Sequence, residues 1–134
     1  MNTLFLRFAG ASTLTTAGVC AVAAYPLFRW GGSDGLISLG IAAGVTLAGA
    51  LGGFVPLSRA PASDAAACVQ AALIGIAIRM FLTLGAVAGI ALADLAPHRG
   101  AFLIGAAALY VALLAVETRF AARLAAAAGK TAAA

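Results

Sequence analysis

The feature that most constrains this chain is a series of long apolar runs separated by short polar linkers. A transmembrane helix needs about 20 consecutive apolar residues to cross a hydrocarbon core of about 30 Å. Four runs meet that requirement, at residues 8–29, 36–57, 65–94 and 100–124. Only 9% of the 134 residues are charged and 64% are hydrophobic, whereas about a quarter of the residues in an average soluble domain are charged. The sequence therefore predicts one integral membrane domain over residues 1–134.

The linkers between the runs carry turn and helix-breaking signals. They read RWGGSDG, SRAPASD and ADLAPHRG, and their glycines, prolines and aspartates are typical of helix ends and turns. Short linkers place consecutive helices side by side and antiparallel. The apolar runs also lack the alternation expected of barrel strands. We therefore expect an all-α fold of four transmembrane helices arranged as two antiparallel hairpins.

The basic residues in the linkers and termini predict the orientation of this bundle. With both termini on one side, five cations lie on that side, namely Arg7, Arg59, Arg119, Arg123 and Lys130. Arg29 and Arg99 lie on the other side. Positive charge accumulates on the cytoplasmic side of membrane proteins, so we expect cytoplasmic termini. The anionic inner leaflet also accounts for the net charge of +4 without a nucleic-acid partner.

A cleaved signal peptide is the alternative interpretation of the N-terminus. A basic residue precedes an apolar run that ends in Ala21-Val22-Ala23, a pattern that such peptides share. Its removal would leave three spans and cancel the charge asymmetry, so we favour a first transmembrane helix.

Arg79 stands in the middle of the third apolar run. A charge at the centre of a spanning helix costs about 2.5 to 3.5 kcal/mol on insertion scales, so such residues usually face protein or water and have a partner. Three of the four acids, Asp34, Asp64 and Asp94, lie in or beside linkers. Glu117 is the acid that can be drawn into the bilayer.

Hairpin geometry supports pairing between these two residues. Arg79 lies 16 residues before Leu95, and Glu117 lies 17 residues after Gly100. At about 1.5 Å per residue the two side chains start at nearly the same depth. We therefore predict an intramembrane charge pair, with Thr83, Tyr110 and Gln70 as supporting polar residues. The alternative is that Arg79 snorkels to the inner surface with its stem in lipid.

Small residues at a spacing of three or four predict where helices pack closely. The candidates in the second and third helices are Gly40, Gly44, Ala48, Gly52, Gly75, Gly85 and Gly89, with Gly49 and Gly53 as a second ridge. Such ridges serve packing within the chain or a face that binds a partner, and the sequence leaves both uses open.

No pattern of catalytic or cofactor-binding residues stands out. GKT at residues 129–131 lacks the glycine that a phosphate-binding loop needs five residues earlier, where Leu124 stands. Cys20 and Cys68 form no paired metal motif, and His98 with Asp94 gives too few ligands for a structural zinc site. We predict neither an enzyme nor a bound cofactor or metal.

The third run contains GIAIRMFLTLG and the fourth contains LYVALLAVETRFAARL. With the four-helix layout, these stretches make the chain resemble the ATP synthase protein I family, mainly over residues 74–124. The resemblance implies a bacterial inner-membrane protein that assists assembly or stability of the c-ring of an F-type ATP synthase. Some members carry an acid and a lysine in the third helix. This chain has Gln70 and Arg79 there, which argues against cation conduction.

Two other functions remain open on the sequence. One is a small oligomeric transporter of ions or solutes in which Arg79 and Glu117 line a path. The other is a structural subunit of a different membrane complex. The expected partners are the lipid bilayer, ATP synthase c subunits as the resemblance implies, and further copies of the chain if it is a homo-oligomer.

Overall fold

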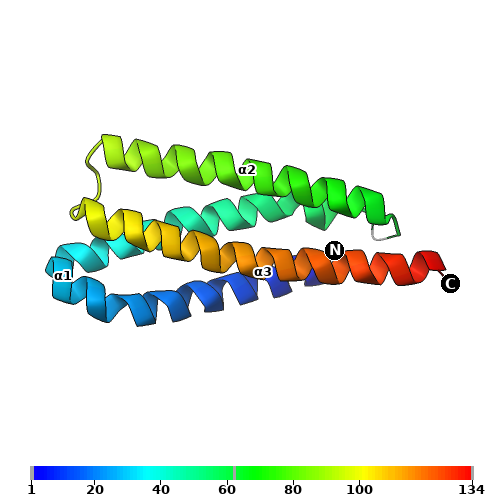
Figure 1. The fold of residues 1–134 in the computed structure, drawn as a ribbon, viewed down its shortest axis with the longest axis horizontal. Coiled ribbons are helices and arrows are strands. Elements are labelled where there is room, and N and C mark those ends of the chain that lie inside the picture. Colours follow the sequence, from blue (N-terminus) through cyan, green and yellow to red (C-terminus); the bar gives the residue numbers. More distant parts are fainter. Residues whose placement is uncertain (1, 62, 134) are drawn as a thin grey trace.

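The chain folds into a bundle built only of helices in the computed structural model, which describes residues 2–61 and 63–133. The elements are α1 (Asn2–Arg59), α2 (Ala65–Leu92) and α3 (Arg99–Ala133). No strand is present among the described residues. The two chain ends lie toward the same end of the bundle (Figure 1). We call this the terminal end and the opposite one the turn end.

The predicted number of helices is wrong, because the first two predicted helices are one element, α1. Within α1 the chain leaves helical geometry at Gly32, whose φ is 59° and ψ is −144°. Glycine adopts such a backbone conformation without the steric penalty of a side chain. The chain reverses in this region, so that α1 consists of an N-terminal arm (residues 2–31) and a C-terminal arm (residues 33–59) (Figure 1). The reversal falls inside the RWGGSDG linker.

Helix α2 has a local signal at each end. Asp64 caps its start, where Oδ1 accepts hydrogen bonds from the backbone N–H groups of Ala66 (2.9 Å) and Ala67 (3.2 Å). After its end, Asp94 adopts a positive φ of 55° and the Leu95 N–H donates to the Ile90 carbonyl. This is the bonding pattern of a Schellman motif. The structure ends α2 at Leu92, close to the predicted residue 94.

Helix α3 continues well past the predicted residue 124, to Ala133. Its last part is rich in alanine, the strongest helix former, so local propensity favours its extension.

The apolar core lies between the two arms of α1 and α3. Toward the turn end, Leu27 and Leu39 of α1 pack with Phe102 and Leu109 of α3. Toward the terminal end, aromatic rings from both arms and α3 meet. Phe8 stacks on Phe54 with ring centroids 3.8 Å apart and contacts Phe120 edge-on at 5.6 Å.

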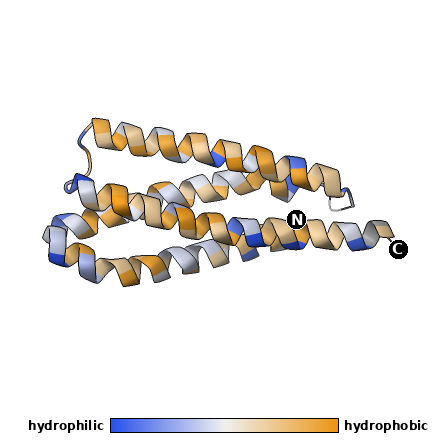
Figure 2. Cartoon of the chain, viewed as in Figure 1, coloured by the Kyte–Doolittle hydropathy of each residue, from blue (hydrophilic) through white to orange (hydrophobic). Residues whose placement is uncertain are grey.

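Helix α2 lies outside this core and packs mainly on α1. One face of α2 is buried, and large apolar residues such as Leu73, Phe81 and Leu92 are exposed on the rest of its surface. Apolar residues predominate along its length (Figure 2). All three helices are long and apolar enough to cross a membrane, which fits a membrane location for the chain.

A polar cluster fastens the turn end of the bundle. The His98 N–H donates to Ser38 Oγ (2.9 Å), and His98 Nδ1 accepts from the Ala101 N–H (3.0 Å) at the start of α3. The Trp30 ring lies edge-on to the imidazole at 4.8 Å. These contacts join the reversal of α1 to the loop between α2 and α3.

Candidate functional site: a buried ion pair between α2 and α3

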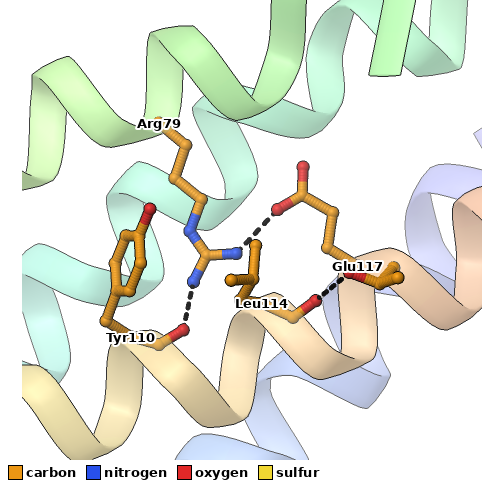
Figure 3. A network of polar contacts seen from close by, with 5 residues as sticks. Arg79, Tyr110, Leu114 and Glu117 are labelled. Atoms are coloured by element: carbon orange, nitrogen blue, oxygen red, sulfur yellow. Dashed lines mark hydrogen bonds and ion pairs between the residues drawn. The ribbon is translucent and has the colours of Figure 1, made fainter. Parts of the chain in front are cut away.

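The structure brings Arg79 of α2 and Glu117 of α3 into contact. Arg79 Nη1 lies 2.6 Å from Glu117 Oε2, and the side chain of Arg79 has no solvent-accessible surface. The carboxylate side chain is 5% exposed. Figure 3 shows the guanidinium reaching from α2 across to α3, where the glutamate turns back toward it. In the predicted alternative the arginine head leaves the bundle, whereas here it is enclosed.

Tyr110 contributes two further contacts to the arginine. Its backbone carbonyl accepts a hydrogen bond of 2.9 Å from Arg79 Nη2. Its ring lies over the guanidinium, with Cζ 4.7 Å from the ring centroid, a cation–π geometry (Figure 3). The prediction named Tyr110 as a polar support, and the structure shows that the carbonyl and the ring make these contacts. The sequence could not predict the contact with the backbone carbonyl, because every residue has a backbone carbonyl group.

The other two predicted supports do not bind the pair. Gln70 is exposed on α2 and lies more than two turns from Arg79. Thr83 is buried, but its Oγ1 has no hydrogen-bond partner among the described residues. Arg79 Nε is likewise unpartnered in that part of the chain. The ion pair is therefore supported by the Tyr110 carbonyl and ring rather than by polar side chains.

Glycines allow α2 to approach α1 closely beside the arginine. A Cβ added at Gly53 would lie 2.8 Å from both Arg79 Cβ and the Gly75 carbonyl oxygen. A Cβ at Gly75 would collide with the Gly53 carbonyl oxygen, and one at Gly49 would collide with Thr83 Oγ1. Because only glycine fits these positions, the stem of Arg79 lies directly against the backbone of α1.

The predicted packing residues divide into two groups. Gly75 lies at the α1–α2 contact, and a Cβ at Gly52 would meet Leu82 Cδ1 at 3.4 Å. At Gly40, Gly44, Gly85 and Gly89 an added Cβ would have no atom within 4 Å, and Ala48 is exposed. These five residues do not pack within the chain as expected. The closest contact between α1 and α2 instead uses the second ridge, Gly49 and Gly53. These two glycines lie opposite Thr83 and Arg79 of α2.

Two apolar grooves lie between α2 and α3, one on each side of the ion pair. The larger, of about 420 Å³, lies toward the turn end and is lined by residues such as Leu84, Val87, Ala107 and Tyr110. The smaller, of about 240 Å³, lies toward the terminal end between residues 68–73 of α2 and 118–125 of α3. Side chains of α2 and α3 thus leave space between the two helices on both sides of the Arg79–Glu117 contact, toward the turn end and toward the terminal end.

The cysteines and the histidine, for which the sequence predicted no metal site, do not contact the ion pair. Cys20 is partly buried in α1 and Cys68 is buried in α2, and both are free thiols. His98 belongs to the polar cluster at the turn end. Within residues 2–61 and 63–133, no three His, Cys, Asp or Glu side chains are grouped closely enough to hold a metal ion.

The arrangement places one cation and one anion in contact within an apolar bundle. Removing one partner of such a buried pair strands the other charge, which is strongly destabilising, whereas replacing both with apolar residues is often neutral. The pair is therefore able to fix α2 against α3. A carboxylate from elsewhere could also exchange with Glu117 for the same guanidinium donors.

Fold and site together define the class as an all-helical protein with apolar helices able to cross a membrane and, among the residues that the structure describes, one buried ion pair between helices. Comparisons of this chain with protein-family models, curated proteins and solved structures found no match.

Proposed function

We propose that this chain is a non-enzymatic accessory protein of a bacterial F-type ATP synthase that assists assembly or stability of the c-ring. The proposal starts from the resemblance of residues 74–124 to the ATP synthase protein I family. It places the chain in the bacterial inner membrane with both termini cytoplasmic, in accord with the distribution of basic residues.

The observation that carries the proposal is the buried Arg79, held by Glu117 at 2.6 Å in an apolar bundle. A c subunit carries a carboxyl group within the membrane, and an unpaired charge there is costly. An assembly factor that offers a guanidinium could shield this carboxylate until the ring closes. Glu117 would hold Arg79 in the free protein and compete with the incoming carboxylate, which would make binding reversible.

The surroundings of the pair suit such an exchange. The larger groove is lined almost entirely by apolar atoms and includes Tyr110, whose ring lies over the guanidinium. A partner helix in this groove would lie one aromatic ring away from Arg79. The lipid-facing surface of α2 is also extensive, because only one face of this helix is buried.

The test is recovery of c subunits with the tagged protein from native membranes in mild detergent, followed by mass spectrometry. Arg79→Ala should reduce c-subunit recovery, whereas Arg29→Ala, which removes an exposed arginine at the turn end, should not. The double variant Arg79→Met/Glu117→Leu removes both charges, so a stable fold with the same loss would assign the loss to the arginine.

Two outcomes would contradict the proposal. Equal recovery of c subunits with and without Arg79 would remove the arginine from the mechanism. Recovery of the tagged protein alone would favour a small transporter instead, and flux into proteoliposomes would then be the measurement to make.

A further inference from the structure

We propose that the terminal end of α3, together with the smaller groove between α2 and α3, forms a binding site for an anionic phospholipid. Arg119, Arg123 and Lys130 would hold the lipid phosphate, and the groove would hold part of an acyl chain. This site does not depend on the proposed link to the ATP synthase, because it requires only this chain and a lipid.

The three cations form a stripe along one side of α3. They are all exposed and are separated by four and seven residues. At 3.6 residues per turn, these spacings keep them within about 40° of one another around the helix axis. The only ion pair among the described residues is Arg79–Glu117, so no acid neutralises this stripe in that part of the chain.

The position of the stripe along α3 suits a lipid headgroup. Arg119 and Arg123 follow Glu117 by two and six residues, or about 3 and 9 Å along the helix. Phe120, between them, still packs on Phe8 in the aromatic core. The arginines therefore lie on the exposed side of the last core layer of the bundle, which Phe120 and Leu124 help to form, and their long stems can extend the guanidinium groups toward the membrane surface.

The smaller groove borders this stripe. It has a volume of about 240 Å³ and is lined by Val69 and Leu73 of α2 and by Ala121, Ala122 and Ala125 of α3, among others. Ala122 is three residues from Arg119, and residues at this spacing are neighbours on a helix surface.

The groove presents apolar surface rather than free polar groups. Thr118, which also lines it, donates its hydroxyl hydrogen bond to the Leu114 carbonyl of its own helix (2.8 Å). The site thus places an apolar groove beside a row of cations. The groove complements the acyl chain of an anionic phospholipid, and the cations complement its headgroup.

Charge identifies the ligand as anionic. At the turn end the exposed arginines Arg29 and Arg99 are accompanied by the exposed acids Asp34 and Asp94. The stripe on α3 has no such acids beside it in sequence after Glu117. Arginine binds phosphate oxygens through paired hydrogen bonds, and each cation near an anionic leaflet contributes about 1 kcal/mol.

The experiment is titration of the purified, delipidated full chain with phosphatidylglycerol or phosphatidylcholine of identical acyl chains, followed by native mass spectrometry. Phosphatidylglycerol should bind more tightly. The triple variant Arg119→Gln/Arg123→Gln/Lys130→Gln should weaken its binding by about fivefold per cation, on the order of 100-fold in all. The double variant Arg29→Gln/Arg99→Gln is the matched control and should leave binding unchanged. Equal binding of the two lipids, or unchanged binding by the triple variant, would overturn the proposal.

The groove is tested separately with Ala122→Phe, which fills it, against Ala108→Phe, which adds the same ring at an exposed position of α3 toward the turn end, away from the cation stripe and outside the lining of both grooves. Only Ala122→Phe should weaken binding of the long-chain lipid. Short-chain dihexanoyl phosphatidylglycerol and inorganic phosphate should bind at least about tenfold more weakly than the long-chain lipid. If either binds as tightly as the long-chain lipid, the groove holds no acyl chain and the proposed site is wrong.

Discussion

Helices α2 and α3 have similar apolar sequences but are held in the bundle in different ways. α3 inserts large side chains such as Phe102, Leu109 and Leu113 into a core that both arms of α1 complete. α2 buries a smaller share of its apolar length, and its buried residues are mostly small, apart from Arg79. One helix is held by packed side chains, and the other by close backbone contact and one ion pair.

This difference shows what can hold helices together when lipid surrounds them. Apolar side chains gain little from leaving lipid for a protein interior, so association depends on packing and on polar contacts. α3 gains packing on two sides. α2 has grooves along α3 instead, and the Arg79–Glu117 contact lies between these grooves. We therefore expect the position of α2 to depend on this pair more than the position of α3 does.

Loss of Glu117 should have the largest effect on stability and tests most directly whether α2 depends on the ion pair more than α3 does. Glu117→Ala leaves a buried guanidinium without its carboxylate, which we expect to destabilise the fold by about 3 kcal/mol. α2 should loosen first, because its contact with α3 depends on the pair. Unfolding in mixed micelles would give the free-energy change, and hydrogen exchange of α2 and α3 peptides would show which helix opens.

Two further variants control this prediction. Arg79→Met should be milder than Glu117→Ala, because methionine is a flexible apolar side chain that fills much of the space of the arginine stem, whereas alanine leaves the glutamate site empty. The double variant Arg79→Met/Glu117→Leu should recover most of the stability, since it leaves no buried charge. Equal loosening of α2 and α3 in Glu117→Ala would show that the pair does not act on α2 in particular.

The glycine contact between α1 and α2 allows a sharper test with a smaller effect. Gly53→Ala places a methyl group 2.8 Å from Arg79 Cβ and the Gly75 carbonyl oxygen. Forcing an extra group into a packed contact costs about 1 to 3 kcal/mol, so Gly53→Ala should destabilise the fold by that amount. The same unfolding measurement would detect it.

Gly44→Ala is the matched control, in the same arm of α1. A Cβ there has no atom within 4 Å, and alanine is the better helix former, so stability should stay the same or rise slightly. Equal destabilisation by the two substitutions would mean that the close contact at Gly53 does not hold α2.

The sequence predicted apolar helices and the pairing of Arg79 with Glu117, because the first follows from the length of the apolar runs and the second from counting residues along a hairpin. Arg79 lies 16 residues before Leu95 and Glu117 lies 17 residues after Gly100, and the structure brings the two side chains together. The predicted reversal in the RWGGSDG linker agrees with the break at Gly32, but the sequence did not show that helical geometry resumes within so few residues that the two arms form one element, α1. The choice between glycine ridges was also missed. Gly44 and Gly53 are equivalent in spacing patterns, and only the relative rotation of α1 and α2 decides which one lies at the contact.

Substitution of Thr83 should give the smallest change in stability, and this change should be stabilising rather than destabilising. Other threonines, such as Thr46, donate their hydroxyl hydrogen bond to the carbonyl four residues earlier, but Thr83 Oγ1 is buried against Gly49 and has no hydrogen-bond partner among the described residues. An unsatisfied buried hydroxyl is unfavourable, so Thr83→Val should keep stability or raise it by up to about 1 kcal/mol. Thr46→Val, which removes a satisfied hydroxyl at a fully buried site, should lower stability by about 0.5 kcal/mol. If Thr83→Val is the more damaging of the two in the unfolding measurement, the hydroxyl supports the α1–α2 contact through a polar interaction, and α2 is held by more than close packing and one ion pair.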